Sequence, residues 1–446
     1  MRIFLLLLAL ISTPSLSWAS ATSLFSELKQ TVFQIRVIDI ASGDKFTIGS
    51  GFQISEQGHI ATNFHVVSPY VHDPDKYRLE FVRPAKSKGS DDEEIIQPAQ
   101  LLTFDVIHDL ALLTMNNTDN SQHDFLAISD QPLNKGDRIY SMGNPHDLGM
   151  TIIEGNYNGL LQASRYQKIL FSGSLNSGMS GGPAINTQGE VIGINVSTQG
   201  SAISYLVPAS YLQALIEETD ASKQDTLEID ASQSEAPKNT KDRYKQRIHK
   251  ALMNDQQIFY SELLKQDFKT EKLGDVKVAN KLSSTLKCWG HSTDNADEES
   301  AAAKYQGAHQ HCVTEDEIYL SGDLSLGQFY YDFEWITSDD LNPFQFYTVI
   351  EERFSHGGLN TTYQEQHVTE FQCADNIIAL AEHSWKISTC FRAYKDFPDL
   401  YDSQLVMASI DGQQQALVAK IGAAAITRDN ATLLFKRFME SISWNK

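Results

Sequence analysis

Three short segments of the sequence contain the residue types that act together in nucleophilic catalysis. His65 ends the stretch Gly58-His-Ile-Ala-Thr-Asn-Phe-His, Asp109 precedes Leu-Ala-Leu-Leu, and Ser180 lies within Asn176-Ser-Gly-Met-Ser-Gly-Gly-Pro. A serine hydroxyl is a weak nucleophile at neutral pH unless an imidazole takes its proton, and that imidazole needs a carboxylate to hold its tautomer. We therefore expect His65, Asp109 and Ser180 to act as a catalytic triad.

These segments resemble the chymotrypsin-fold serine proteases, specifically the HtrA/Deg-like branch, over about residues 30–210. The similar features are a Gly49-Ser-Gly-Phe strand, a Thr-Asn-x-His-Val-Val stretch, an Asp-x-x-x-Asp-Leu-Ala-Leu-Leu segment and the serine loop, in that order. The resemblance implies hydrolysis of peptide bonds in protein or peptide substrates through an acyl-enzyme, without a cofactor or a metal. It also implies that Asp109, and not Asp105, is the catalytic aspartate.

The serine loop has the glycines that an oxyanion site needs, with two departures from the family pattern. Backbone N–H groups must meet the oxyanion of the tetrahedral intermediate, and in such loops they come from the serine and the residue two before it, here Ser180 and Gly178. Met179 stands where the relatives have Asn or Asp, and Ser177 replaces their usual proline. The sequence leaves open what holds this loop in an active conformation.

The segment before the loop bears on the P1 residue, the one that precedes the cleaved bond. Trypsin-like enzymes place an aspartate six positions before the nucleophile; here that position is Ser174, followed by Leu175. A buried cation without a partner is costly, so Lys or Arg is not expected at P1. We expect a specificity pocket at Ser174 and Leu175 that favours small or aliphatic P1 residues.

The same residues fit two other interpretations. Gly178–Gly182 also fits the Gly-x-Ser-x-Gly elbow of α/β-hydrolases, but that elbow needs a helix directly after the serine and the order serine, acid, histidine. Pro183 and a strand-like segment follow here, and the histidine and aspartate lie upstream. The second alternative is a binding or chaperone-like protein that keeps the protease fold but has lost turnover because Met179 misplaces the loop. The intact triad and Gly178 argue against it.

The surrounding segments predict the scaffold. Between residues 22 and 218, β-rich runs such as Val32–Ile38 and Gly189–Val196 alternate with Gly, Asn and Asp turn signals, which is typical of an all-β barrel or sandwich. Together with the resemblance, this predicts a trypsin-like serine protease domain over residues 22–218. Its expected fold is an all-β double β-barrel.

The N-terminus has the features of an export signal. Arg2 supplies a positive charge, Ile3–Ile11 an apolar run and the small residues around Ala19 a cleavage site, so residues 1–21 are predicted to be a signal peptide. A bilayer takes about 20 apolar residues, and this run is much shorter. We expect an exported protein, periplasmic or secreted, without stable membrane insertion. The net charge of −21 argues against nucleic acid as a partner.

The second half of the chain departs from the family. Residues 219–240 are rich in Asp, Ser, Gln, Lys and Glu and are predicted to be a linker. Residues 241–446 are predicted to be an α+β accessory domain that begins with a helix over about 241–268. Its expected strands include Gln345–Ile350. HtrA-like proteases usually carry PDZ domains at this place, and no Gly-Leu-Gly-Phe type loop is recognisable here.

All four cysteines lie in this second half: Cys288, Cys312, Cys373 and Cys390. Export favours disulfides, for which three pairings are possible, and the local pairs Cys288–Cys312 and Cys373–Cys390 are preferred. The alternative is a zinc site that adds His291, His309 and His311 to Cys288 and Cys312, although their separations fit no standard zinc finger. We expect a disulfide-stabilised unit that folds independently of the protease domain.

Overall fold

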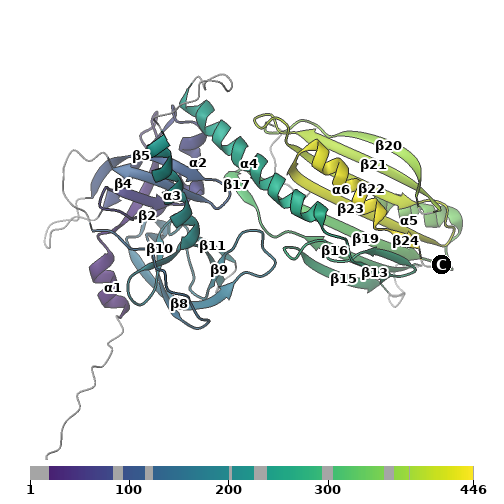
Figure 1. Ribbon diagram of the computed structural model, residues 1–446, viewed down its shortest axis with the longest axis horizontal. Coiled ribbons are helices and arrows are strands. Elements are labelled where there is room, and N and C mark those ends of the chain that lie inside the picture. Colours follow the sequence, from purple (N-terminus) through teal and green to yellow (C-terminus); the bar gives the residue numbers. More distant parts are fainter. Residues whose placement is uncertain are drawn as a thin grey trace, which may run out of the picture.

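The computed structural model describes residues 20–83, 94–115, 124–199, 203–225, 239–293, 305–355, 366–380 and 382–444. Residues 1–19 of the predicted signal peptide therefore lie outside the described residues. Two lobes are visible in Figure 1, one built from the first half of the chain and one from a large sheet in the second half. The long helix α4, Thr240–Lys265, runs from the first lobe to the second.

The first lobe contains two closed, six-stranded antiparallel barrels, so the predicted double-barrel fold is confirmed. The first barrel has the strand order β1-β2-β3-β6-β5-β4. Its strands are β1 Val32–Asp39, β2 Lys45–Gln53, β3 His59–Thr62, β4 Tyr77–Arg83, β5 Ile95–Asp105 and β6 Leu110–Met115. The second barrel has the order β10-β11-β12-β9-β8-β7. Its strands are β7 Arg138–Gly143, β8 Thr151–Leu160, β9 Ile169–Phe171, β10 Pro183–Ile185, β11 Val191–Gln199 and β12 Ile203–Pro208.

Helices cover the barrels, and one of them corrects the predicted linker. Helix α1 is Ala21–Leu28, α2 is Phe64–His72, and α3 is Ala209–Asp225. Because α3 continues to Asp225, residues 219–225 are helical although their polar composition suggested an exposed linker. Residues 226–238 lie outside the described part. Helix α4 then begins at Thr240, with the Asn239 side chain accepting from the Asp242 N–H at 2.9 Å.

The second lobe is α+β, as predicted, and centres on a seven-stranded antiparallel sheet of order β15-β16-β19-β23-β22-β21-β20. Its strands are β15 Lys287–Thr293, β16 Gln306–Val313, β19 Phe329–Thr337, β20 Gln372–Leu380, β21 His383–Ala393, β22 Tyr401–Ser409 and β23 Gln415–Ile426. Helix α6, Arg428–Glu440, and the end of α4 pack on one face of this sheet around Phe333, Leu434 and Phe438. A smaller sheet consists of β13 Thr270–Leu273, β14 Val276–Ala279 and β24 Ser443–Trp444.

Two disulfides fasten the edge strands of the large sheet. Cys288 in β15 is bonded to Cys312, the residue directly opposite in β16, and Cys373 in β20 is bonded to Cys390 in β21. Both pairs are local in sequence, with separations of 24 and 17 residues. Cys288 and Cys312 are thus bonded to each other, whereas the zinc alternative needed both as thiolate ligands.

One predicted strand of the second lobe is wrong. Residues Gln345–Ile350 belong to helix α5, Pro343–Ser355, which packs on the sheet face opposite α6. The helix begins with a reciprocal pair of hydrogen bonds, because Asn342 Oδ1 accepts from the Gln345 N–H and Gln345 Oε1 accepts from the Asn342 N–H, each at 3.1 Å. This capping arrangement, followed by Pro343 in the first turn, starts a helix in a segment whose composition suggested a strand.

The two lobes share a hydrophobic core, contrary to the expected independent unit. A hairpin of the second half, β17 Ile318–Ser321 and β18 Leu324–Leu326, packs with α2 and the first barrel in one buried cluster. The first half of α4 joins the same cluster through Ile248 and Leu252. An ion pair between Arg165 Nη2 and Asp255 Oδ2, at 2.6 Å, ties the second barrel to α4. None of the helices in the described ranges is both long enough and apolar enough to cross a membrane.

Candidate functional site

The structure brings together His65, at the start of helix α2, and Asp109, in the turn between β5 and β6 of the first barrel. The His65 Nδ1 atom is 2.7 Å from Asp109 Oδ2, and the backbone N–H of His65 donates to Asp109 Oδ1 at 2.8 Å. His65 lies in the first turn of α2, so the carboxylate also accepts from a free N–H at the helix N-terminus, where negative charge is favoured. Both side chains are partly buried: the exposed fraction is 25% for His65 and 18% for Asp109.

This arrangement changes the pKa of the imidazole. Burial by itself lowers the pKa of His65, but the negative charge of Asp109 and its hydrogen bond to the ring outweigh burial, so that the pKa is raised above its usual range. The same bond holds the Nδ1 proton on the side of the carboxylate and leaves Nε2 as the atom that can accept a proton.

A tight turn between β5 and β6 places Asp109. Asp105 Oδ1 accepts from the N–H groups of Ile107 and His108, at 2.9 and 3.2 Å, and Asp105 Oδ2 is 2.6 Å from His108 Nδ1. Asp109 itself has φ +56°, a left-handed conformation that Asp tolerates better than most residues. Asn63 Nδ2 donates to the Asp109 carbonyl at 2.8 Å and fixes the other end of this turn. Asp105 therefore shapes the turn, whereas Asp109 contacts His65.

Ser180 lies in a loop joined to β2, because the Ser50 N–H donates to the Ser180 carbonyl, and its hydroxyl points to β11 of the second barrel. Its Oγ donates to the carbonyl of Val196 at 2.9 Å. Val196 sits at an irregularity in the pairing of β11 with β12, where a carbonyl is freed from the ladder. A Cβ atom on Gly49 would lie 2.6 Å from Val66 and 3.1 Å from the Ser180 carbonyl, so this glycine permits the close approach of α2 and the serine loop.

The loop before Ser180 has the backbone conformation that only glycine accommodates. Gly178 has φ +93°, and a Cβ there would lie 2.4 Å from the carbonyl oxygen of Asn144. Within the described part of the chain, neither the Gly178 N–H nor the Ser180 N–H donates to a backbone carbonyl. Two neighbouring donors are thus free on the candidate nucleophile loop, as an oxyanion site requires.

Four hydrogen bonds from three residues that the sequence reasoning missed hold this loop. The buried Ser50 hydroxyl donates to the Gly178 carbonyl at 2.7 Å, and its backbone N–H donates to the Ser180 carbonyl, also at 2.7 Å. The backbone N–H of His146 donates to the Ser177 carbonyl at 2.7 Å. Asn195 Nδ2 donates to the Met179 carbonyl at 3.2 Å. The Ser in Gly49-Ser-Gly was the available signal for the first of these contacts.

Met179, the departure from the family pattern, is fully buried. Its side chain packs in the core of the second barrel with Leu175, Phe171 and Ile139. An apolar anchor therefore stands where the relatives have a polar side chain. Of the two residues predicted for the P1 pocket, Leu175 points into this same core and Ser174 is exposed.

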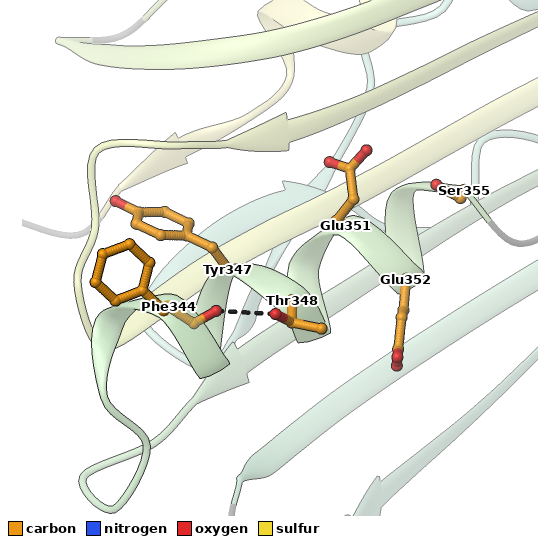
Figure 2. A pocket seen from close by; sticks show the side chains of 6 residues that line it. All are labelled: Phe344, Tyr347, Thr348, Glu351, Glu352 and Ser355. Atoms are coloured by element: carbon orange, nitrogen blue, oxygen red, sulfur yellow. Dashed lines mark hydrogen bonds between the residues drawn. The ribbon is translucent and has the colours of Figure 1, made fainter.

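A cavity of about 450 Å³ opens beside the imidazole. His65, Asp109 and Val196 line it from the barrels, and Tyr319 and Ser325 line it from the β17–β18 hairpin. The Tyr319 ring forms a T-shaped contact with the His65 ring, with ring centroids 5.8 Å apart. Another hollow, of about 480 Å³, runs along α5 from Phe344 to Ser355 (Figure 2), but the six residues that line it include no histidine.

Comparison with known proteins matches the first half of the chain. Residues 49–194 match the family described as "Trypsin-like peptidase domain". A "Probable periplasmic serine endoprotease DegP-like" of Brucella suis is 33% identical over 180 residues, covering 38% of this chain and 32% of the relative. "Serine protease HTRA1" of Xenopus laevis is 31% identical over 179 residues, covering 38% of this chain and 36% of the relative. The chain thus spans about a third of the length of these relatives.

Similar solved structures also cover less than half of the chain. The crystal structure of a serine endoprotease from Yersinia pestis is 24% identical with a TM-score of 0.38, and covers 46% of this chain and 68% of the other. The crystal structure of Deg5 is 24% identical with a TM-score of 0.37, and covers 43% of this chain and 90% of the other.

Proposed function

We propose that this chain, whose residues 49–194 match a trypsin-like peptidase domain and resemble the HtrA/Deg-like serine proteases, is an exported serine endopeptidase. The observation that carries the proposal is the 2.7 Å contact between His65 Nδ1 and Asp109 Oδ2, and the serine loop with its two free N–H donors adds to it. A fluorophosphonate probe tests it, because the probe reacts with activated serines. Labelling of Ser180 together with cleavage of casein is expected; an unlabelled, folded protein would contradict it.

In the proposed mechanism, the Ser180 hydroxyl first rotates from the Val196 carbonyl toward Nε2 of His65. The imidazole takes the hydroxyl proton as Ser180 Oγ attacks the carbonyl carbon of the scissile peptide bond. Asp109 holds the ring and stabilises the imidazolium that forms. The imidazolium then gives its proton to the leaving amine as the C–N bond breaks, which leaves an acyl-enzyme on Ser180. Water, activated by the neutral His65, hydrolyses this ester.

The N–H groups of Gly178 and Ser180 are proposed to bind the oxyanion of each tetrahedral intermediate. Ser50, through the Gly178 carbonyl, and His146, through the Ser177 carbonyl, orient the two peptide groups that flank Gly178. The buried side chain of Met179 anchors the loop from the opposite side. These contacts support the proposal that an apolar anchor and the Ser50 hydroxyl together hold the loop in its active conformation.

Replacing Gly178 is expected to damage turnover more than folding. In Gly178→Ala, the new methyl group would meet the Asn144 carbonyl at 2.4 Å at a positive φ, so the loop must shift and its N–H must leave the oxyanion position. Loss of one such donor lowers kcat by about 10²–10³. Steady-state kinetics on a peptide ester should show a fall in kcat with little change in KM. A variant with unchanged kcat would contradict the role of Gly178.

For specificity, we propose small or aliphatic P1 residues, because neither Ser174 nor Leu175 offers a carboxylate to a basic side chain. A peptide library varied at P1 should be cleaved best at Ala, Val or Leu. Dominant cleavage after Lys or Arg would overturn this prediction.

Export and domain organisation complete the proposal. The predicted leader over residues 1–21 is in line with the word "periplasmic" in the name of the Brucella relative. We propose a protease domain over residues 22–218 and an accessory domain over residues 241–446. Protein or peptide substrates, no nucleic acid and no stable membrane insertion are proposed with it.

One observation favours a second candidate function. Because the Ser180 hydroxyl donates to Val196, a protein that keeps this rotamer would bind polypeptides in the cleft without cutting them, as a chaperone-like module. The fluorophosphonate experiment separates the two, since only an activated serine reacts at an appreciable rate.

A further inference from the structure

The β17–β18 hairpin reaches from the accessory region to the candidate catalytic residues. Leu320 and Leu326 are fully buried in the core shared with the first barrel, and Ile318 is 2% exposed. The His72 Nε2–H donates to the Leu320 carbonyl at 2.8 Å. Figure 1 shows β17 between the barrels and the large sheet, beside α4. The hairpin is therefore anchored by apolar burial and is part of the cleft in this structure.

A second anchor joins the start of the hairpin to the other barrel. Asp316, only 1% exposed, accepts from the Ser164 hydroxyl at 2.7 Å and from the Arg165 backbone N–H at 2.5 Å. Lys168 Nζ lies 3.5 Å from the same carboxylate. The hairpin thus bridges the two barrels at the place where His65 and Val196 face the cavity.

Two side chains of the hairpin form one wall of this cavity. Tyr319 and Ser325 are directly paired across the hairpin, and both line the space next to His65. The Tyr319 ring packs against the imidazole in a T-shaped arrangement, and its hydroxyl lies near Ser68, whose own hydroxyl donates to the His65 carbonyl at 3.1 Å. The wall therefore contacts the candidate general base directly.

The residues that line the cavity indicate which kind of side chain it can bind. Four tyrosines line it (Tyr166, Tyr205, Tyr211 and Tyr319). Of the charged side chains in its lining, Lys168 faces Asp316, Glu315 pairs with Lys287 and Asp109 pairs with His65, whereas the exposed Glu317 accepts from the neutral amide of Gln328 at 2.8 Å. A charged occupant would lose its water among the four tyrosine rings, whereas an apolar one would bury its surface against them.

We propose that the β17–β18 hairpin is a wall of the substrate cleft, and that the cavity it forms with the barrels receives an uncharged aromatic or large aliphatic substrate side chain. This inference rests on the proposed peptidase function. The position recognised differs from P1, because Ser174 and Leu175, proposed for P1, do not line the cavity. The accessory region thus contributes to substrate specificity through this hairpin.

Two opposite substitutions test the wall. Tyr319→Ala enlarges the cavity, and Ser325→Phe fills it. With a peptide library varied at each position around the scissile bond, Tyr319→Ala should lower kcat/KM about tenfold or more for the preferred bulky side chain at one position other than P1, as pocket contacts of this size do. Ser325→Phe should reverse the preference at the same position, from bulky to small side chains. Tyr319→Phe keeps the ring and should keep the preference.

Phe344→Ala serves as the matched control, since this aromatic side chain lies on α5 in the same lobe, is 86% exposed and lies on a different hollow (Figure 2). This substitution should leave the substrate preference in the peptide library unchanged. A profile that is the same in wild type, Tyr319→Ala and Ser325→Phe would overturn the inference. A uniform fall in kcat/KM over all substrates would also overturn it, because the hairpin would then only support the site. A uniform rise in kcat/KM would overturn it as well, because the hairpin would then block the site. Wild-type protein that neither reacts with fluorophosphonate nor cleaves any peptide would instead contradict the proposed function, and the inference with it.

Discussion

Ser180→Ala should abolish peptide cleavage and fluorophosphonate labelling while the protein stays folded. The methyl group cannot attack a carbonyl or form an acyl-enzyme, and loss of a triad serine lowers kcat on the order of 10⁴–10⁶. Folding should be unaffected because the hydroxyl makes one hydrogen bond, to the partly buried Val196 carbonyl. Casein cleavage, probe labelling and the melting temperature measured on one preparation check all three statements.

The control for this substitution is Ser42→Ala, an exposed serine in the turn between β1 and β2. Its hydroxyl only accepts from the Asp44 N–H at 3.1 Å, so cleavage and labelling should match the wild type. If Ser180→Ala cleaved casein at the wild-type rate, Ser180 would not be the nucleophile. Retained cleavage would also remove the basis for the proposed mechanism.

Asp109→Asn should lower kcat by about 10⁴ and move the pH profile. In the wild type, the charge of Asp109 raises the pKa of His65, so the imidazole stays protonated to a higher pH and cannot accept the serine proton there. The acid limb of kcat/KM is therefore expected above the usual histidine range. Removing the charge leaves burial as the main influence, which lowers the pKa, so the residual activity should have its acid limb at lower pH.

Asp105→Asn is the comparison for Asp109→Asn, because Asp105 lies in the same turn but contacts His108 and not His65. It should cost far less activity and leave the acid limb in place. Rate and pH measurements over the same pH range decide between the two carboxylates. Equal losses in both variants would mean that the turn as a whole, and not the Asp109 charge, supports His65.

The strands of the barrels could be predicted because they have a local signal, whereas their closure into two barrels was implied by the resemblance to the chymotrypsin-fold proteases. The runs of β-branched and aromatic residues in β1 and β11, separated by Gly, Asn and Asp turns, define short strands wherever they pack. Helix α5 could not be read in the same way. Gln345-Phe-Tyr-Thr-Val-Ile350 contains strand-forming residue types, and its helical state depends on the Asn342–Gln345 cap and on burial of Phe346 and Ile350 against the sheet.

The start of the accessory region shows the same limit. Its first helix was predicted, and α4 lies over Thr240–Lys265. The accessory region was expected to be an independent unit, but the apolar side chains along one face of this helix pack against both lobes. Ile248 and Leu252 pack against the first barrel, whereas Tyr260 and Leu263 pack under the large sheet. A periodic apolar pattern indicates that a helix is buried, but it does not say against which partner.

The sequence by itself determined the candidate catalytic residues and an all-β barrel or sandwich, and its resemblance to the HtrA/Deg-like proteases implied the double barrel. Nucleophile, base and carboxylate are recognisable as residue types within short motifs, and strand patterns are local. Only the tertiary structure decided that Ser50 holds the Gly178 carbonyl, that Met179 is a buried anchor, and that a hairpin from the accessory region stands beside His65. The His72–Leu320 hydrogen bond joins residues 248 positions apart. Contacts of this kind follow from how whole elements pack, because no local spacing encodes which distant surface an apolar face will cover.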